Sequence, residues 1–152
     1  MRCHLIAVGK AKPDAARALF RDYAQRLSPP LRLVEVEEKR NLPSAQLRER
    51  EAELLLDALP KGATVVMLDE RGKALASREF AERIGSWQDQ GIADLAFLVG
   101  GAAGHGKAVG ARADLMLSLG PATWPHMLIR GMIAEQLYRA QQILIGHPYH
   151  RD

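Results

Sequence analysis

The last six residues of the chain carry its most versatile chemistry. They read HPYHRD, so His147, Tyr149, His150 and Arg151 fall within one short segment. Histidine is the side chain whose ordinary pKa lies near neutrality, and arginine can pair with a phosphate or stabilise an anion. Chain ends usually fray, and this composition is unusual for an end without a role. The tail is therefore predicted to have a role of its own, shared by these four residues.

A glycine-rich connection offers a second kind of chemistry, recognition by the backbone. Leu95–Val99 is apolar at every position, as expected of a strand covered on both faces, and the glycines Gly100, Gly101, Gly104 and Gly106 follow it. Glycine permits positive φ and lets a ligand approach main-chain amides. Ligands bind at the carboxyl ends of strands in open α/β sheets, so this turn predicts a small-molecule or nucleotide site. A plain connection between strand and helix is the alternative.

Two known motifs come close to these residues without matching them. Gly101–Ala108 (GAAGHGKA) resembles the phosphate-binding P-loop, but Ala108 stands where a Ser or Thr hydroxyl would ligate magnesium, and only 44 residues follow. Cys3 and His4 lie at the opposite end of the chain from the tail histidines and lack the spacing of zinc ligands. We therefore expect neither a P-loop nucleotide hydrolase nor a metal site.

The order of the elements predicts the framework that positions these groups. Strands are expected at residues 3–8, 31–36, 64–68, 95–99 and 115–119, with amphipathic helices between them. Ser44 and Ser77 are expected to cap two helices, and Asp69–Lys73 is expected to be a polar turn. Strands that alternate with helices favour an α/β fold, here a single domain over residues 1–152 with a mostly parallel sheet flanked by helices. The alternating strand at 31–36 is expected at an edge.

The longest predicted helix runs from His126 to about Ile145, after a loop, Gly120–Pro125, that is too rich in Gly and Pro to be regular. One face of this helix is apolar, with Leu128 and Met132 beside a stripe made of Ile129, Ile133, Leu137, Ala140 and Leu144. This surface is wider than one sheet would cover. We therefore expect a homodimer formed through this helix.

Composition limits the class of protein further. A chain of 152 residues with 47% apolar content can form one domain with a core, and its net charge of +3 is compatible with an RNA partner. The basic clusters are either a phosphate-binding surface or solvated faces: Lys10, Lys12, Arg17 and Arg21, then Lys39 and Arg40. A single cysteine fits a reducing cytosol. No apolar run approaches the roughly 20 residues that span a bilayer, so we expect a cytoplasmic protein without a membrane partner.

Six segments spread along the chain carry a likeness to one family. They read IAVGK at residues 6–10, VVMLDERGK at 65–73, FLVGGAAGHG at 97–106, TWPH at 123–126, AEQLYRA at 134–140 and HPYHR at 147–151. In combination they resemble the RlmH family of the SPOUT methyltransferases. The resemblance implies methyl transfer from S-adenosyl-L-methionine to nitrogen 3 of a pseudouridine in large-subunit (23S) ribosomal RNA. It also implies a homodimer and a carboxyl-terminal trefoil knot.

The same resemblance implies cofactor contacts at three strand ends. Matched position by position, these residues are Leu68, Gly100, Leu119, Gly120, Pro121, Ala122, Thr123 and Trp124. Gly120-Pro121 departs from the Ser-Ala type of sequence expected in this loop, so contacts through the backbone are expected there. Two of these strand ends are the connections that the residues alone single out.

The implied reaction assigns a role to the tail. Methyl transfer from a sulfonium needs alignment of the nucleophile, a base for the imide proton and positive charge for the ring oxygens. His147, Tyr149, His150 and Arg151 supply these types of group. The expected partner is ribosomal RNA, within the assembled ribosome. The alternative is a non-enzymatic RNA-binding or ribosome-associated factor, which cofactor binding would distinguish.

Overall fold

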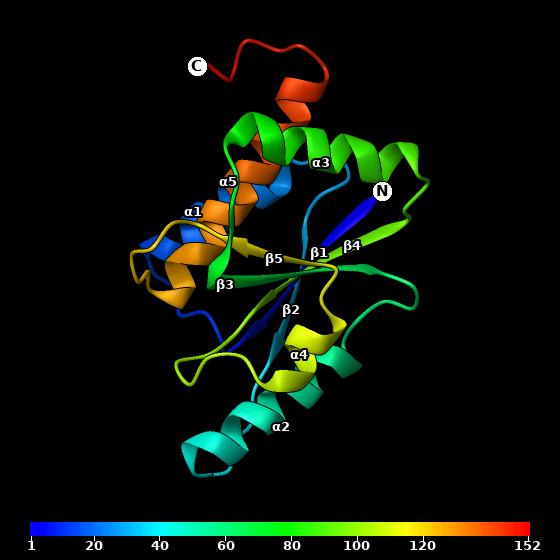
Figure 1. Ribbon diagram of the computed structural model, residues 1–152. Coiled ribbons are helices and arrows are strands. Elements are labelled where there is room, and N and C mark those ends of the chain that lie inside the picture. The colour runs from blue at the N-terminus through cyan, green and yellow to red at the C-terminus, as the bar shows by residue number, and fades with distance from the viewer.

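The computed structural model describes residues 1–152, and strands alternate with helices along the whole chain (Figure 1). The elements are β1 (Arg2–Val8), α1 (Ala15–Arg26), β2 (Arg32–Val36), α2 (Ser44–Asp57), β3 (Thr64–Ala74), α3 (Ser77–Asp89), β4 (Asp94–Val99), α4 (Lys107–Arg112), β5 (Leu115–Ser118) and α5 (His126–Leu144). The five strands and the long last helix are confirmed.

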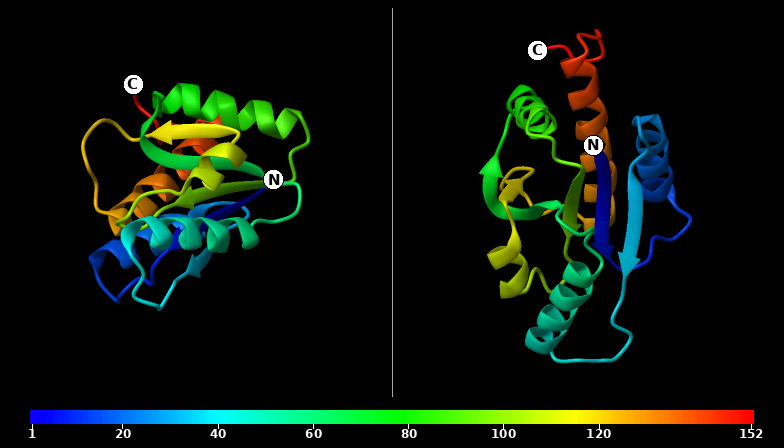
Figure 2. Two further views of the ribbon diagram at one scale, coloured as in Figure 1. Left: turned by 60° about the horizontal axis from the view of Figure 1, so that its bottom comes forward. Right: turned by 90° about the vertical axis from the view of Figure 1, so that its right-hand side faces the viewer.

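The strands form one sheet in the order β2-β1-β4-β3-β5, and every pair is parallel. The prediction of an α/β fold with a parallel sheet is therefore confirmed, as is the edge position of β2. Helices α1, α3 and α5 cover one face, with α5 between the other two, and α2 and α4 cover the opposite face (Figure 2). The carboxyl ends of all five strands consequently meet at the same edge of the sheet.

The two faces of the sheet explain why the central strands are apolar at every position. In β4, Leu95 and Phe97 face the core beneath α1, α3 and α5, while Ala96 and Leu98 face the core beneath α2 and α4. All four are completely buried. Alternate residues of one strand thus serve two cores, as expected of a central parallel strand.

The pairing of β3 with β5 departs from the prediction. Leu68 and Lys73 both lie opposite Leu117, so the four residues between them bulge out before β3 pairs with β5 a second time. The polar turn expected at Asp69–Lys73 is therefore wrong, because β3 continues to Ala74. The second pairing joins segments more than 40 residues apart, a contact that no local pattern reveals. The trefoil knot stays a prediction.

The two serine caps are also wrong. Ser44 and Ser77 are the first helical residues, and neither helix has a side-chain bond from its N-cap residue. At α3 the Glu79 carboxylate accepts from the Ala76 amide at 2.7 Å, while the Ser77 hydroxyl donates to Gln136 of α5 at 2.8 Å. Ser77 therefore joins two helices instead of capping one.

Helix α5 follows its predicted stripe in the middle and departs from it at both ends. Ile133, Leu137 and Ala140 are buried, but Leu144 is 42% exposed. The largest fully buried side chain of the protein is Arg130, one position beyond the predicted stripe residue Ile129. Helix α5 thus buries a charge as well as an apolar face.

We predict that Gly72→Ala destabilises the fold through the bulge between Leu68 and Lys73. A Cβ at Gly72 would lie 2.6 Å from main-chain atoms of Met116 in β5, so the two segments would have to separate. Overpacking of this kind costs about 1–3 kcal/mol. Gly110→Ala in α4 is the matched control, since nothing lies within 4 Å of its Cβ. Urea unfolding checks both, and equal midpoints would contradict the close approach of β3 and β5.

Candidate functional site

A cavity of about 710 Å³ lies at the carboxyl ends of β3, β4 and β5. Three connections form its walls: residues 68–71 after the first part of β3, residues 99–105 at the end of β4, and residues 119–126 between β5 and α5. These loops gather at the left of the molecule in Figure 1. The cavity therefore stands where ligands bind in open α/β sheets.

Seven of the eight predicted cofactor residues line this cavity. They are Leu68, Gly100, Leu119, Gly120, Ala122, Thr123 and Trp124, whereas Pro121 does not line it. Pro121 is exposed in the loop between β5 and α5. The structure thus brings three separate strand ends together, as the resemblance requires, while the role of each residue stays a prediction.

The loop after β5 is shaped by its own backbone and by Ser118. Gly120 has φ of +103°, a conformation that side chains other than glycine rarely adopt. The Ser118 hydroxyl donates to the Gly120 carbonyl at 3.0 Å and accepts from the Gly120 amide at 3.1 Å. The Trp124 indole N–H donates to the Leu119 carbonyl at 3.3 Å. The turn is therefore held from inside, through the amide and carbonyl of Gly120 and the carbonyl of Leu119.

His105 joins two walls of the cavity, and the sequence did not single it out. Its Nε2 lies 3.1 Å from the Leu68 carbonyl oxygen, so a neutral ring donates its proton there. The other ring nitrogen is buried without a partner, beside Gly100. Burial lowers the pKa of His105 below its usual range, although the Leu68 carbonyl and Asp69 act in the opposite direction. Two predicted contact residues, Leu68 and Gly100, are thus positioned by a neutral imidazole.

The glycine-rich turn does not have the environment of a P-loop. The Lys107 amide donates to the Glu49 carboxylate at 3.4 Å. A Glu51 carboxylate oxygen lies 3.0 Å from where a Cβ at Gly101 would stand. Two acidic side chains therefore face the backbone that a P-loop would offer to phosphate. Burial raises the pKa of Glu51, and the charge of Glu49 disfavours an anion there. No group of three His, Cys, Asp or Glu side chains is placed to hold a metal ion.

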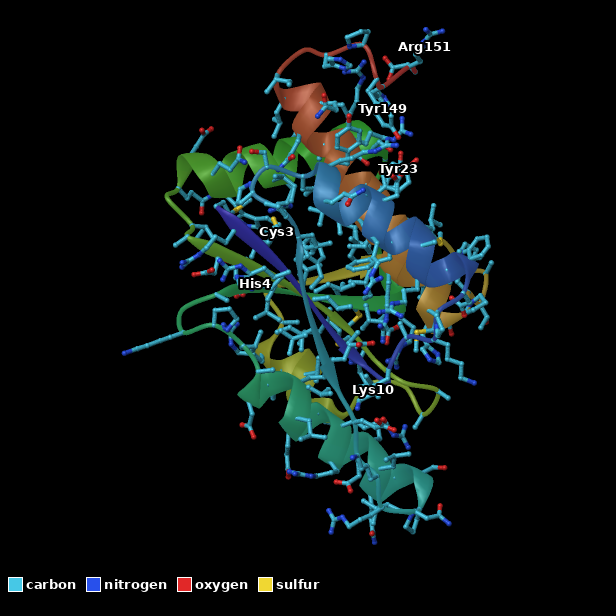
Figure 3. All side chains as sticks on the ribbon, turned by 180° about the vertical axis from the view of Figure 1, so that it is seen from behind. Cys3, His4, Lys10, Tyr23, Tyr149 and Arg151 are labelled. Carbon is cyan, nitrogen blue, oxygen red and sulfur yellow. The ribbon has the colours of Figure 1, made fainter.

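The predicted catalytic tail lies elsewhere in the same chain. None of its four residues lines the large cavity. The Tyr149 hydroxyl donates to Glu135 of α5 at 3.1 Å, and Glu135 stands about 9 Å along the helix from Ile129, the last α5 residue that lines the cavity. Figure 3 shows Arg151 pointing away from the rest of the molecule. The structure therefore groups the four tail residues but does not bring them to the cavity of their own chain.

Tyr149 is the anchor of the tail. Its ring meets Tyr138 edge-on at a centroid distance of 4.9 Å, and the Arg139 guanidinium lies over it at 4.9 Å. Burial raises the pKa of Tyr149, and its bonds to Tyr23 and Glu135 act in the same direction. His150 is held between Arg139 at 3.1 Å and the Asp152 carboxylate at 3.0 Å. Tyr149 and His150 are thus fixed in place, whereas Arg151 is exposed.

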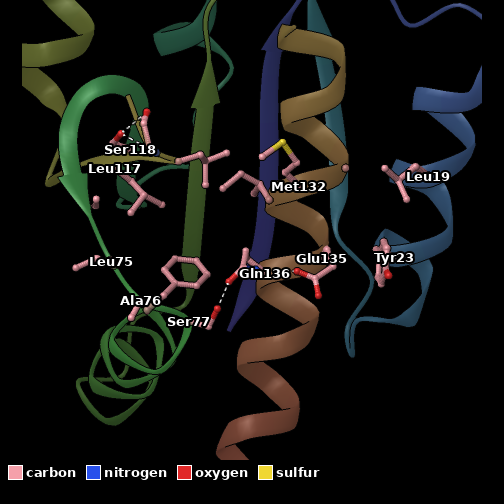
Figure 4. Close-up of a pocket in the computed structure, with 16 residues that line it drawn as sticks. Leu19, Tyr23, Leu75, Ala76, Ser77, Leu117, Ser118, Met132, Glu135 and Gln136 are labelled. Carbon is pink, nitrogen blue, oxygen red and sulfur yellow. Dashed lines mark hydrogen bonds between the residues drawn. The ribbon is translucent and has the colours of Figure 1, made fainter. Parts of the chain in front are cut away.

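A second, mostly apolar cavity of about 550 Å³ lies beside this anchor (Figure 4). Leu19 and Tyr23 of α1 stand on one side, Leu75 on the other, and Met132 of α5 between them, and Phe80 also lines the cavity. Figure 4 shows the chain from β3 to α3 arching around Leu117 and Ser118 of β5. Leu117, Leu119 and Gly120 line both cavities. The two cavities are therefore neighbours that share the end of β5.

The parallel α/β architecture is that of the SPOUT methyltransferases. The chain matches the family model of predicted SPOUT methyltransferases over residues 1–150, and it belongs to this family. A probable methylase family protein from Haemophilus influenzae shares the fold, with a TM-score of 0.57 and 12% identity over 99% of this chain and 70% of that one.

Relatives within the family carry a more particular name. The chain is 60% identical to a protein of Paramagnetospirillum magneticum over 99% of both chains, and 58% identical to one of Rhodospirillum centenum with the same coverage. Both are named ribosomal RNA large subunit methyltransferase H.

None of the five helices combines the length and the apolar composition that a bilayer span requires.

We predict that His105 makes folding stability depend on pH. Its pKa in the folded protein lies below the ordinary value of about 6.5, so the unfolded chain binds the extra proton more readily. Stability should therefore fall as pH drops from about 6.5 towards the folded pKa. Urea unfolding of the wild type and of His105→Gln at several pH values checks this, because the variant lacks that loss. Identical pH dependence in the two proteins would contradict a buried neutral His105.

Proposed function

We propose that the protein transfers a methyl group from S-adenosyl-L-methionine to nitrogen 3 of a pseudouridine in 23S ribosomal RNA. Membership of the SPOUT family and relatives of 60% and 58% identity support the reaction class and the substrate. The observation that carries the proposal is the convergence of three strand-end loops on one cavity. Because ribosomes are the proposed substrate, the cytoplasm is the proposed compartment.

The residues around the large cavity fit a nucleoside cofactor. A volume of about 710 Å³ lies within the range of roughly 300–1,000 Å³ typical of small-molecule sites. The wall contains Gly100, Gly101 and Gly120, where no side chain stands between the main chain and a ligand. At Gly100 a Cβ would come within 3.3 Å of the His105 ring, so glycine is needed for this close packing. Bound S-adenosyl-L-methionine would supply a methyl group activated by a positively charged sulfur.

The residues of the chain must position the pseudouridine ring and accept the proton that its imide nitrogen loses. The imide N–H has to lose a proton to a base, and the negative charge that develops on the ring oxygens favours a nearby cation. Within the tail, Tyr149 is committed to Glu135 and acts as the anchor. His147 accepts from the Tyr149 amide at 3.2 Å through one ring nitrogen, which leaves the other nitrogen available. Arg151 has no carboxylate partner and supplies the free charge.

These distances support a site shared between two subunits. The tail is anchored on the part of α5 that lies away from the large cavity of its own chain. To act in catalysis, it would have to complete the cavity of a second copy. The apolar cavity between α1 and α3 offers a surface for such a copy, with Leu19 38% exposed at its side. We propose a twofold homodimer in which α5 of one subunit lies against this surface of the other.

A methylation assay tests the proposed function directly. Tritiated S-adenosyl-L-methionine is incubated with ribosomes or with free RNA, and the modified base is mapped; calorimetry with a chelator present measures cofactor binding. We expect label on nitrogen 3 of one pseudouridine and cofactor binding without added metal. RNA binding without cofactor binding would favour the non-enzymatic RNA-binding factor instead.

We predict that Arg151→Ala slows methyl transfer by roughly 100-fold, equivalent to about 3 kcal/mol of transition-state stabilisation. Arg83→Ala is the matched control, because Arg83 is also exposed and has no carboxylate partner. Both variants should melt like the wild type and bind the cofactor normally, since neither residue lines the cavity. Equal rates for the two variants would remove Arg151 from the reaction.

A complementation experiment tests the shared site. Ala122→Trp fills the cavity from an exposed loop position and should abolish cofactor binding without disturbing the core. We expect Ala122→Trp alone to be inactive and Arg151→Ala alone to keep only its residual rate, but a mixed dimer contains one normal cavity completed by one normal tail. Unfolding and refolding the two together should restore roughly a quarter of the wild-type activity. No recovery in a mixture that sediments as dimers would place tail and cavity in the same subunit.

A further inference from the structure

A third cavity, of about 240 Å³, lies between the beginning of α1 and the first turns of α5. Arg17 and Arg21 of α1, Glu35 of β2 and Arg130 of α5 line it, together with Asp14 and Met127. Three guanidinium groups thus surround a space smaller than the roughly 300–1,000 Å³ of ordinary small-molecule pockets. The size suits a single phosphate group better than a whole nucleotide.

The two carboxylates in this cavity are already committed. Asp14 caps α1 by accepting from the Arg17 amide at 3.1 Å. Glu35 accepts from Arg130 at 2.7 Å and from the Ala11 amide at 2.6 Å. Burial pushes the pKa of Glu35 up, but these two bonds and the charges of Arg130 and Arg17 together outweigh it and leave the pKa below its usual value. Glu35 therefore stays charged and bound to its partners.

The three arginines, by contrast, have N–H donors without a carboxylate or other acceptor. No carboxylate lies within ion-pair distance of Arg17 or Arg21, whereas nine other arginines of the chain are paired. Arg130 is only 2% exposed, and its terminal nitrogens bind Glu35 and the carbonyls of Val8 and Gly9. Its Nε is buried and has no acceptor. A buried N–H donor without a partner is costly, so Arg130 keeps an unsatisfied donor beside the wall of this cavity.

This cavity and the large cavity lie on either side of the first turns of α5. Met127 and Arg130 face the arginine cavity, while their neighbours His126 and Ile129 line the cavity at the strand ends. The same turns of α5 therefore separate the two, across a helix about 10 Å in diameter. A nucleic-acid strand that crosses the start of α5 can place a base at one cavity and a neighbouring phosphate at the other.

We propose that Arg17, Arg21 and Arg130 form a subsite for a backbone phosphate of the RNA next to the nucleotide that is methylated. This inference rests on the proposed function for its RNA partner. Arginine is suited to the role because its planar fork of N–H donors matches phosphate oxygens. Lys10 and Lys12, on the loop before α1, add positive charge along the approach.

The double variant Arg17→Gln/Arg21→Gln tests the subsite. Its control, Arg32→Gln/Arg83→Gln, removes the same charge from two unpaired arginines outside the three cavities. We expect the first variant to bind RNA at least about 10-fold more weakly than the control, with the slope of log affinity against log salt smaller by roughly 1 to 2. Cofactor affinity should be unchanged in both. Equal RNA affinities and salt slopes in the two variants would overturn the proposal.

An NMR titration separates this proposal from the proposed function. Inorganic phosphate is added to the protein while the Arg130 Nε–H resonance is followed. The signal should shift in the wild type and stay fixed in Arg17→Gln/Arg21→Gln, even if no methyl transfer occurs. Absence of a shift in the wild type would overturn the subsite whatever the methylation assay shows. A shift without any loss of RNA affinity in the double variant would mean a site for free phosphate and would overturn the RNA assignment.

Discussion

The double pairing of β3 with β5 is the contact on which the functional surfaces depend. β5 is an edge strand of four residues, and β3 is its only neighbour in the sheet. Leu117 is held twice, by Leu68 before the bulge and by Lys73 after it. The first pairing places Leu68 at the rim of the large cavity, and the second leads the chain into the wall of the apolar cavity. A shift of β5 would therefore change the proposed cofactor site and the proposed subunit surface together.

Arg130 fixes the start of α5, on the other side of the large cavity from β3, and this requires a buried charge. Such a charge is tolerated only when it is paired and hydrogen-bonded. Here it binds Glu35 of β2 and the carbonyl groups of Val8 and Gly9 at the end of β1. These bonds attach the start of α5 to the ends of two strands. The loop before α5, which carries most of the predicted cofactor contacts, is thus anchored at both of its ends, by Ser118 at one and Arg130 at the other.

The sequence predicted the features that depend on residues within one short segment. A strand apolar at each position such as Leu95–Val99 has to be central, and glycines after it mark a loop that a ligand can approach. Contacts between distant segments could not be predicted in this way. The role of Ser77 depends on Gln136 of another helix, and that of His105 on a carbonyl of β3. Arg130 lies within a helix whose apolar stripe dominates its pattern, so its burial becomes visible only once Glu35 is beside it.

The tail shows why a chain end can be ordered although it adds little to the core. Helix α5 ends at Leu144. Gly146 follows with φ of +73°, and the His147 amide donates to the Gln142 carbonyl, a Schellman arrangement. The segment then folds back, and Tyr149 binds Glu135 while Asp152 pairs with Arg78 of α3. A free tail would lose conformational entropy each time a subunit or RNA bound, and that loss would weaken binding. Because Tyr149 and Asp152 are already held before binding, most of this entropy loss is avoided. Arg151 lies between them in the sequence and points outward. An outward charge on a pre-ordered end is what a residue needs in order to act on the site of a second subunit.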